Sequence, residues 1–311
     1  ESETIEKVAH NIKFDKNVLL NYGIQVKGKT FDTLLAHYLI DPESRHKLDI
    51  LSEKYLEYTM IDFETVFGKN TKPPFSIEKI NLELLTEYAV EDADITFALK
   101  PILEEELRKN NLLELFTNIE MPLVDVLLSM ERQGVKIDTN QLHNFSQLLQ
   151  EQKQELEQRI YQLAGRKFNI SSPKQLGAIL FDELKISSDK KIKKTQTKQY
   201  STSEDVLQKL INYHPIIPLI LEYRSLTKLK STYVDVLPEI VNQKTGKIHT
   251  NYKQATTSTG RLASENPNLQ NIPIRTDLGK QIRSCFIPQN EEYTLLAADY
   301  SQIELRIIAS L

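Results

Sequence analysis

The hydrophobic pattern of the sequence changes near residue 112. This change excludes one uniform fold and predicts parts of different secondary structure. Over the first 110 residues, short apolar runs alternate with apolar residues spaced three and four apart, which predicts strands and helices of an α/β domain. From Leu113 to Pro238 the helical spacing dominates, and from Gly246 a strand pattern returns. We therefore expect an α/β part, a mainly α part and the start of an α+β part.

The individual elements follow from the same patterns and from capping signals. Glycines at 134 and 165 end two of the predicted helices, and Ser172-Pro173 opens another. The predicted helices span residues 16–22, 30–39, 46–55, 82–109 with a break near Pro101, 121–132, 141–163 and most of 203–238. The predicted strands span residues 7–14, a segment from Gly246, and 294–298, with a polar segment at 256–271 before the last.

Composition narrows the class of protein. No apolar run approaches the ~18 residues of a membrane helix, so we expect no membrane partner. The first residues carry no basic region followed by an apolar stretch, so nothing suggests export. Cys285 is the only cysteine, which excludes an internal disulfide and a cysteine-based zinc site. These features predict a cytoplasmic protein.

Charge is distributed unevenly along the chain. The net charge is −4, but residues 1–120 carry −9 and residues 121–311 carry +5. Basic residues cluster at 185–198 and at 224–230, which makes the second part the better candidate for binding a polyanion. A solvated lysine surface is the alternative interpretation of such clusters.

The last residues of the chain combine a carboxylate with a helix start. Asp299 follows the predicted strand at 294–298 directly, a place suited to holding a metal ion. Ser301 and Glu304 also have the spacing of a capping box, in which Glu304 reaches back to the helix start. Ile303 and Ile307 would lie on one helix face that needs a partner. The residues alone leave both interpretations open.

Two polar motifs precede this segment. Ser258-Thr259-Gly260-Arg261-Leu262 is followed by Asn266-Pro267-Asn268-Leu269-Gln270-Asn271-Ile272-Pro273-Ile274-Arg275. Amide and guanidinium groups beside small residues can approach a nucleic-acid groove and donate to base edges and sugars. An Asn/Pro turn cluster is the alternative.

Taken together in this order and spacing, the motifs resemble the family A DNA polymerases, the family of the bacterial DNA polymerase I enzymes. The two polar motifs and Asp299-Tyr300-Ser301-Gln302-Ile303-Glu304-Leu305-Arg306 are similar to the palm of that family. Glu222-Tyr223-Arg224 and Lys228-Leu229-Lys230-Ser231-Thr232-Tyr233 resemble its thumb, and residues 245–250 the strand entering the palm. The resemblance implies template-directed primer extension.

The resemblance also implies roles for single residues. Asp299 would be the first of two palm aspartates that hold two Mg²⁺ ions, with the Tyr300 carbonyl as a further ligand. Glu304 would exclude a ribose 2′-hydroxyl, beside Ser301 and Gln302 in the nucleotide site. The residues implied to contact primer-template DNA are Arg261, which would read the minor groove, and Asn268, Gln270, Asn271, Arg224, Lys228, Lys230, Ser231 and Thr232. The partners implied are primer-template DNA and deoxynucleoside triphosphates, bound by a monomer associated with the nucleoid.

The N-terminal part resembles the 3′–5′ exonuclease of the same family, which has a ribonuclease H-like fold. Asn11-Ile12-Lys13-Phe14-Asp15 and Tyr88-Ala89-Val90-Glu91-Asp92 are similar to its second and third motifs. The resemblance makes Asp15 and Asp92 metal ligands, Tyr88 the residue that orients the attacking water, and Asn11 a DNA contact. The spacing alone places Tyr88 and Asp92 on one helix face. It leaves Asp15 as a possible helix N-cap and Tyr88 as a possible core residue.

Two departures from the family pattern limit this interpretation. The family's first exonuclease motif, Asp-x-Glu, does not precede Asn11, and no second palm aspartate follows Asp299. Asp62-Phe63-Glu64 has the right letters but follows the second motif, so we interpret it as a coincidence in an exposed segment. We therefore expect an internal piece of a polymerase with three segments: a partial exonuclease at 1–112, connecting helices and thumb at 113–245, and the start of the palm at 246–311.

Such a piece is expected neither to polymerise nor to edit efficiently. Measurable primer extension by these 311 residues with magnesium and nucleotides would refute this expectation. Two alternatives stay open: a DNA-binding module that grips duplex through Arg224, Lys228 and Lys230, and a polymerase whose exonuclease is inactive.

Overall fold

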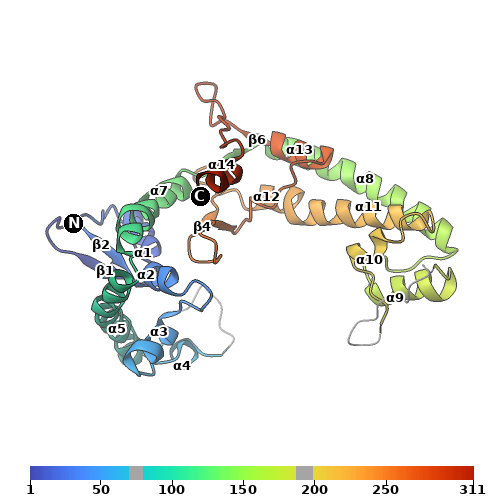
Figure 1. Ribbon diagram of the computed structural model, residues 1–311. Coiled ribbons are helices and arrows are strands. Elements are labelled where there is room, and N and C mark those ends of the chain that lie inside the picture. The colour runs from blue at the N-terminus through green and yellow to red at the C-terminus, as the bar shows by residue number, and fades with distance from the viewer. Residues whose placement is uncertain (70–79, 187–198) are drawn as a thin grey trace. The chain divides into compact units, whose positions relative to one another are not determined.

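The computed structural model describes residues 1–69, 80–186 and 199–311 (Figure 1). The chain forms two compact units, each made of two separate stretches of sequence. Unit 1 comprises Glu1–Gly134 and His249–Gln270, and unit 2 comprises Val135–Ile248 and Asn271–Leu311. The predicted segments at 1–112, 113–245 and 246–311 stay a prediction, since the compact units follow packing and not the motif boundaries.

Unit 1 begins with two parallel strands joined by a helix. Strand β1 (Lys7–Ala9) pairs in parallel with β2 (Thr30–Asp32), and helix α1 (Ile12–Asn21) makes the crossover that a parallel pair requires. The prediction of a strand over 7–14 was wrong beyond Ala9, because Asn11 adopts a left-handed conformation (φ 68°) that turns the chain into α1. The predicted helix at 30–39 begins three residues later, because residues 30–32 pair with β1.

Four further helices follow along the chain. They are α2 (Thr33–Ile40), α3 (Leu48–Leu56), α4 (Phe63–Phe67) and α5 (Leu82–Lys109), and α5 packs against α2, α3 and β1. The predicted break near Pro101 was wrong, since α5 is continuous through it. Proline removes one helical hydrogen bond. Leu99, Leu103 and Leu107, all fully buried, hold the helix against the core on both sides of that position.

The rest of unit 1 is a helical arm and a hairpin. The arm consists of α6 (Leu113–Leu115), the π-helical turn η2 (Phe116–Glu120) and α7 (Met121–Gln133), which ends at Gly134 as predicted. The buried core of unit 1 comes from its first stretch of sequence, and Ala255 of the second stretch packs against it. The buried residues are Ile12, Phe31, Leu35, Ala36, Leu51, Ile95, Leu99, Leu103, Leu107, Phe116, Met121 and Val124.

The hairpin pairs β4 (Asn251–Lys253) with β5 (Ala263–Glu265) in antiparallel register. The predicted strand from Gly246 therefore begins at Asn251, and β5 lies in a segment that was predicted to be irregular. Ser264 explains why the polar sequence still forms a strand. Its side chain is 1% exposed, and its hydroxyl hydrogen-bonds the Thr250 hydroxyl at 2.7 Å.

Unit 2 is dominated by two long helices that lie side by side, α8 (Thr139–Ala164) and α11 (Ile216–Leu229) (Figure 1). Helix α8 ends at Gly165 as predicted, and Ser172 caps α9 by accepting from the Gln175 N–H. The remaining elements are β3 (Lys136–Ile137), α9 (Pro173–Gly177), η3 (Ala178–Glu183), α10 (Glu204–Gln208), η4 (Lys230–Val234), α12 (Val236–Glu239), α13 (Asp277–Ser284), β6 (Phe286–Ile287) and α14 (Ile303–Ser310). Strands β3 and β6 pair antiparallel.

The end of the chain differs from its prediction. Residues 294–298 form no strand, because a strand needs a partner and no described segment pairs with them; Leu296 is 90% exposed. The capping box was also wrong. Helix α14 begins at Ile303, and Gln302, in a left-handed conformation, occupies the cap without a side-chain hydrogen bond. Within the described ranges, no helix is both long and apolar enough to cross a membrane.

Candidate functional site

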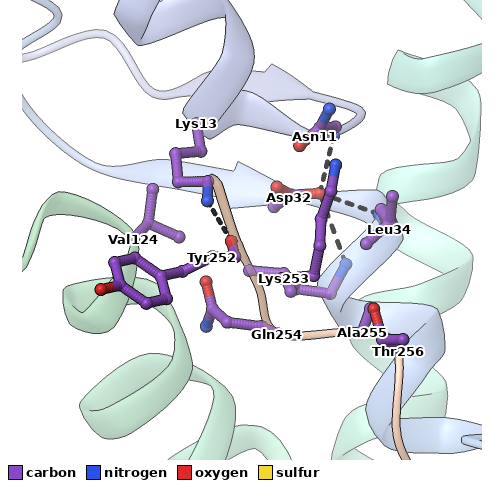
Figure 2. Close-up of a pocket in the computed structure, with 11 residues that line it drawn as sticks. Asn11, Lys13, Asp32, Leu34, Val124, Tyr252, Lys253, Gln254, Ala255 and Thr256 are labelled. Carbon is purple, nitrogen blue, oxygen red and sulfur yellow. Dashed lines mark hydrogen bonds between the residues drawn. The ribbon is translucent and has the colours of Figure 1, made fainter. Parts of the chain in front are cut away.

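The first candidate site is built on the N-terminal turn of α1, which one buried carboxylate fixes (Figure 2). Asp32 is 2% exposed, and its oxygens accept the backbone N–H groups of Asn11 (3.0 Å) and Ile12 (2.9 Å). The same carboxylate caps α2 by accepting from Leu34 (2.9 Å) and Leu35 (3.4 Å). A single side chain therefore sets the start of both helices.

Asp15 lies exposed in the first turn of α1. The alternative that Asp15 caps this helix was wrong, because Asn11 occupies the cap position. Although the residue is exposed, nearby protein atoms partly desolvate the Asp15 carboxyl, which raises its pKa above the usual value. Since Asp32 holds the turn on which both residues lie, it determines where Asn11 and Asp15 point.

Tyr88 and Asp92 lie one turn apart on α5, both half-buried. Burial raises the pKa of Tyr88, and the negative charge of Asp92 raises it further, so the hydroxyl stays a neutral donor. The pKa of Asp92 is raised by burial and by Glu91. The Tyr88 ring meets Phe67 of α4 edge-on, with centroids 6.0 Å apart. The two side chains therefore lie on one face of α5.

Glu91, next to Asp92, anchors the segment that leads into α4. Its carboxylate accepts the Tyr58 hydroxyl and the Ile61 N–H, both at 2.8 Å. Residues 62–64, the Asp-Phe-Glu sequence, lie in an exposed segment at the start of α4, as predicted, and the interpretation of the match as a coincidence stays a prediction.

The described residues include oxygen donors that suit a metal ion. Carboxylate and carbonyl oxygens, as in Asp15, Asp92, Asp299 and Tyr300, are the ligand types that Mg²⁺ prefers. Among the described residues, however, no three His, Cys, Asp or Glu side chains lie together in a way that could hold a metal ion. The donor chemistry fits Mg²⁺, but these residues supply only part of a ligand set.

The second candidate site is the loop of residues 254–262 between β4 and β5, which carries Arg261. Arg261 is exposed, and its guanidinium has no partner in the described part of the chain. The Thr257 hydroxyl donates to the Arg261 carbonyl at 2.8 Å. Arg261 is therefore held by its backbone while its side chain stays free.

Gln270 and Asn268 have structural partners in the same hairpin. The Gln270 amide accepts from the Ser264 N–H (3.2 Å) and donates to the Leu262 carbonyl (2.9 Å). The Asn268 side-chain oxygen accepts the Gln270 N–H at 3.0 Å. Both amides thus brace the end of the hairpin, and their contacts with DNA stay a prediction.

The third candidate site lies in unit 2, where Arg224, Lys228, Thr232 and Asn271 line a groove of about 580 Å³. Helix α13 holds the loop after Asn271 in place. Arg283 donates to the Ile272 carbonyl at 3.0 Å and the Pro273 carbonyl at 3.3 Å, and a Cβ on Gly279 would lie 2.2 Å from the Pro273 oxygen. Only glycine allows this close approach.

Two of the predicted cations in this region are engaged within unit 2. Arg224 is half-buried and donates to the carbonyl and, at 3.1 Å, the hydroxyl of Thr202. Lys230 donates to both Asp235 oxygens (2.8 and 2.9 Å) and to the Ser146 hydroxyl (2.9 Å). Lys228 is exposed, and its ammonium has no partner among the described residues.

The other predicted residues are placed as follows. Ser231 and Thr232 are exposed on η4. Asp299, Tyr300, Ser301, Gln302 and Glu304 are exposed in unit 2, and their side chains make no described contact. The basic cluster predicted at 185–198 lies outside the described residues except for its first two.

The sequence reasoning missed a buried ion pair that joins α1, α7 and β4. The Lys13 ammonium contacts the Tyr252 carbonyl (Figure 2). It also contacts a Glu131 oxygen, and the same oxygen accepts the Tyr252 N–H at 2.7 Å. No local pattern marks such a long-range pair. It also missed Asp32, for which a signal existed, since Asp-Thr before an apolar run is typical of a helix N-cap.

Comparison with protein families gives two matches that together span most of the chain. Residues 139–311, more than half of the chain, match DNA polymerase family A. Residues 1–108 match a 3′–5′ exonuclease family. The first range includes α11, Asn271 and Asp299, and the second includes Asp15, Tyr88 and Asp92.

Several curated proteins are similar over nearly the whole chain, and each is named DNA polymerase I. The protein of Synechocystis sp. is 47% identical over 307 residues, 98% of this chain and 30% of its own length. That of Pseudomonas aeruginosa is 48% identical over 311 residues, 98% of this chain and 33% of its own. That of Geobacillus stearothermophilus is 45% identical, covering 99% and 34%. The chain thus spans about a third of the length of these relatives.

A solved structure is similar in fold. The POL domain of Pol1 from M. smegmatis, in complex with DNA primer-template and dNTP, is similar with a TM-score of 0.83 and 34% identity. The similarity covers 99% of this chain and 50% of that one.

Proposed function

The chain belongs to DNA polymerase family A, and on this premise we propose that the protein containing it extends the 3′ end of a DNA primer along a template. The observation that carries this proposal is the family match over residues 139–311, which includes the Asp299 motif and the groove of unit 2. The similarity to a polymerase bound to primer-template and dNTP supports the same partners.

The residues of this chain have separate tasks in the proposed reaction. Asp299 and the Tyr300 carbonyl would hold Mg²⁺, which supplies charge neutralisation at the transferred phosphate and activates the primer hydroxyl. Glu304, with Ser301 and Gln302, would line the nucleotide site and exclude a 2′-hydroxyl. The protein would act as a monomer in the cytoplasm, on nucleoid DNA.

Binding of duplex DNA is expected to depend on cationic side chains that have no described partner within the chain. Arg224 and Lys230 donate to Thr202 and Asp235, so part of their hydrogen-bonding capacity is used within unit 2. Lys228 and Arg261 keep free charges and are the better candidates for contacts with DNA. The positive charge of residues 121–311 supports a polyanion partner.

Replacing Lys228 with alanine is expected to remove one phosphate contact. The slope of log affinity for primer-template duplex against log salt concentration should become shallower by about 1. Fluorescence anisotropy at several salt concentrations measures this slope. Lys109→Ala is the matched control, because Lys109 is an exposed lysine at the end of α5 in unit 1.

Two outcomes would count against this assignment. An unchanged slope in Lys228→Ala would remove Lys228 from the interface, and an equal change in Lys109→Ala would show a general charge effect. Duplex binding by the whole protein without nucleotide incorporation would favour the alternative of a DNA-binding module.

A 3′–5′ exonuclease is the second activity that a specific observation favours, because residues 1–108 match that family. We infer that Asp15 and Asp92 hold Mg²⁺ and that the neutral Tyr88 hydroxyl orients the attacking water. The parallel strands β1 and β2 with their crossover helix are in keeping with a ribonuclease H-like fold. Asn11, in the turn that Asp32 fixes, would contact the DNA strand.

Replacing Tyr88 with phenylalanine is expected to slow release of 3′ nucleotides from single-stranded DNA about a hundredfold, because the hydroxyl that orients the attacking water is lost. The rate is measured with magnesium present and with the metal removed by chelation, on the protein that contains this chain. Tyr213→Phe, at an exposed tyrosine in unit 2, should keep the full rate. If the unmodified protein releases no nucleotide, its exonuclease is inactive and this second activity is wrong.

A further inference from the structure

A tyrosine of the exonuclease-matched region touches the loop that carries Arg261. Tyr38 of α2 is 3% exposed, and its hydroxyl donates to the Thr257 carbonyl at 2.8 Å. The Thr257 hydroxyl in turn donates to the Arg261 carbonyl at 2.8 Å. Two successive hydrogen bonds therefore connect α2 to the backbone of Arg261.

The base of the hairpin is attached to the same unit at other points. The Lys13 and Glu131 pair holds the backbone of Tyr252. The Gln254 amide donates to the Glu120 carbonyl at 3.0 Å and to its carboxylate at 2.7 Å. These contacts fix β4 and the first residue of the loop, but they lie before Thr257.

The tip of the loop is exposed to solvent, and its Gly260 backbone also hydrogen-bonds Tyr38. Thr256, Ser258, Thr259 and Gly260 are exposed, and Gly260 has a positive φ of 75°. By contrast, the Tyr38 ring is buried and meets the His46 ring edge-on, with centroids 5.7 Å apart. Burial also raises the pKa of Tyr38, so its hydroxyl stays protonated and can donate. A rigid donor therefore meets a loop that is otherwise weakly held.

We propose that Tyr38 is a positioning residue for primer-template binding: it holds the 254–262 loop so that Arg261 is presented to the duplex. This inference rests on the proposed polymerase function, in which Arg261 contacts the primer end. It gives the exonuclease-matched region a task in binding the polymerase substrate that is separate from its own active-site residues. Tyr38 acts through the loop backbone and does not itself touch DNA.

Tyr38→Phe tests this proposal because it removes only the hydroxyl. Loss of one buried hydrogen bond to the loop should weaken primer-template binding about fivefold. Thr257→Val, which removes the hydrogen bond from the Thr257 hydroxyl to the Arg261 carbonyl, should have a similar effect. The decisive comparison is a double-mutant cycle with Arg261→Ala. If Tyr38 acts through Arg261, then Tyr38→Phe should cause no further loss when Arg261 is already alanine.

A second measurement reports on the loop directly and does not need DNA. Selective ¹⁵N-glycine labelling of the protein that contains this chain makes the Gly260 amide a reporter on the loop. In Tyr38→Phe its order parameter should fall below about 0.6, the range of flexible backbone. Gly165, at the end of α8 in unit 2, should not change. Tyr58→Phe is the matched variant, since it removes a 2.8 Å bond to Glu91 elsewhere in unit 1 and should leave Gly260 unchanged.

The outcomes separate this inference from the proposed function. If the unmodified protein fails to bind primer-template DNA, the proposed function is wrong, while the Gly260 measurement still decides whether Tyr38 orders the loop. If Gly260 keeps its order parameter in Tyr38→Phe, the positioning role is overturned. Additive losses in the cycle would overturn it as well, because they would place the effect of Tyr38 elsewhere.

Discussion

Replacing Asp32 with alanine is expected to lower the free energy of unfolding of unit 1 by more than about 3 kcal/mol. Four backbone N–H groups lose their acceptor at once, those of Asn11, Ile12, Leu34 and Leu35. Hydrogen bonds to a charged group contribute about 1.5–3 kcal/mol each, and a buried donor left unpaired costs its full desolvation. Urea unfolding followed by far-ultraviolet circular dichroism measures the loss.

Two variants calibrate this effect. Asp32→Asn keeps the oxygen that serves Asn11, Leu34 and Leu35, so it should cost only about 1–2 kcal/mol, from the unpaired Ile12 N–H. Asp138→Ala removes an N-cap of α8 that accepts a single bond, from Gln141 at 2.9 Å, and should cost about 1 kcal/mol. If Asp32→Ala costs no more than Asp138→Ala, the carboxylate is not the shared anchor of the two helices.

Replacing Glu131 with glutamine is expected to destabilise unit 1 by about 3–5 kcal/mol, because it leaves the Lys13 charge buried without a counter-ion. The two side chains are only 11% and 9% exposed. Glutamine keeps an oxygen for the Tyr252 N–H, so the change isolates the charge from the hydrogen bond. Burial already lowers the pKa of Lys13 despite the nearby carboxylate, which indicates how poorly the site solvates a cation.

The double variant Lys13→Met/Glu131→Gln provides the critical comparison. Removing both charges should recover most of the stability, since a buried pair can often be replaced by groups of similar volume at little cost. Glu106→Gln, which breaks an exposed pair with Lys109, should cost less than about 1 kcal/mol. If the double variant is as unstable as Glu131→Gln alone, the loss comes from packing and not from the unpaired charge.

The sequence predicted best those features whose cause is local. The ends of α7 and α8 were correct because glycine follows each helix, and the start of α9 was correct because Ser172 and Pro173 mark it. The same holds for the helix at 82–109, apart from the break assigned to Pro101. In these cases neighbouring residues contain the full physical reason for the structure.

Features that depend on distant partners could not be predicted. Thr30 begins a strand only because β1 lies beside it, and residues 294–298 form none because no described segment pairs with them. The candidate site residues show the same difference between local and long-range causes. Motif letters indicated Asp15, Tyr88, Asp92 and Asp299, whereas the supports of the site join residues far apart, as Tyr38 does with Thr257.

The interleaving of the two units has a consequence for how the chain folds during synthesis. Unit 1 is complete only when residues 249–270 have been made, and the ribosome must first produce all of residues 135–248. Until then Lys13 and Glu131 lack the backbone of Tyr252, and Tyr38 has no loop to hold. The entropy of closing that long connection must be overcome before these contacts form. The hairpin therefore packs onto unit 1 late in synthesis. The exonuclease-matched region reaches its final stability only after residues 135–248 have emerged from the ribosome.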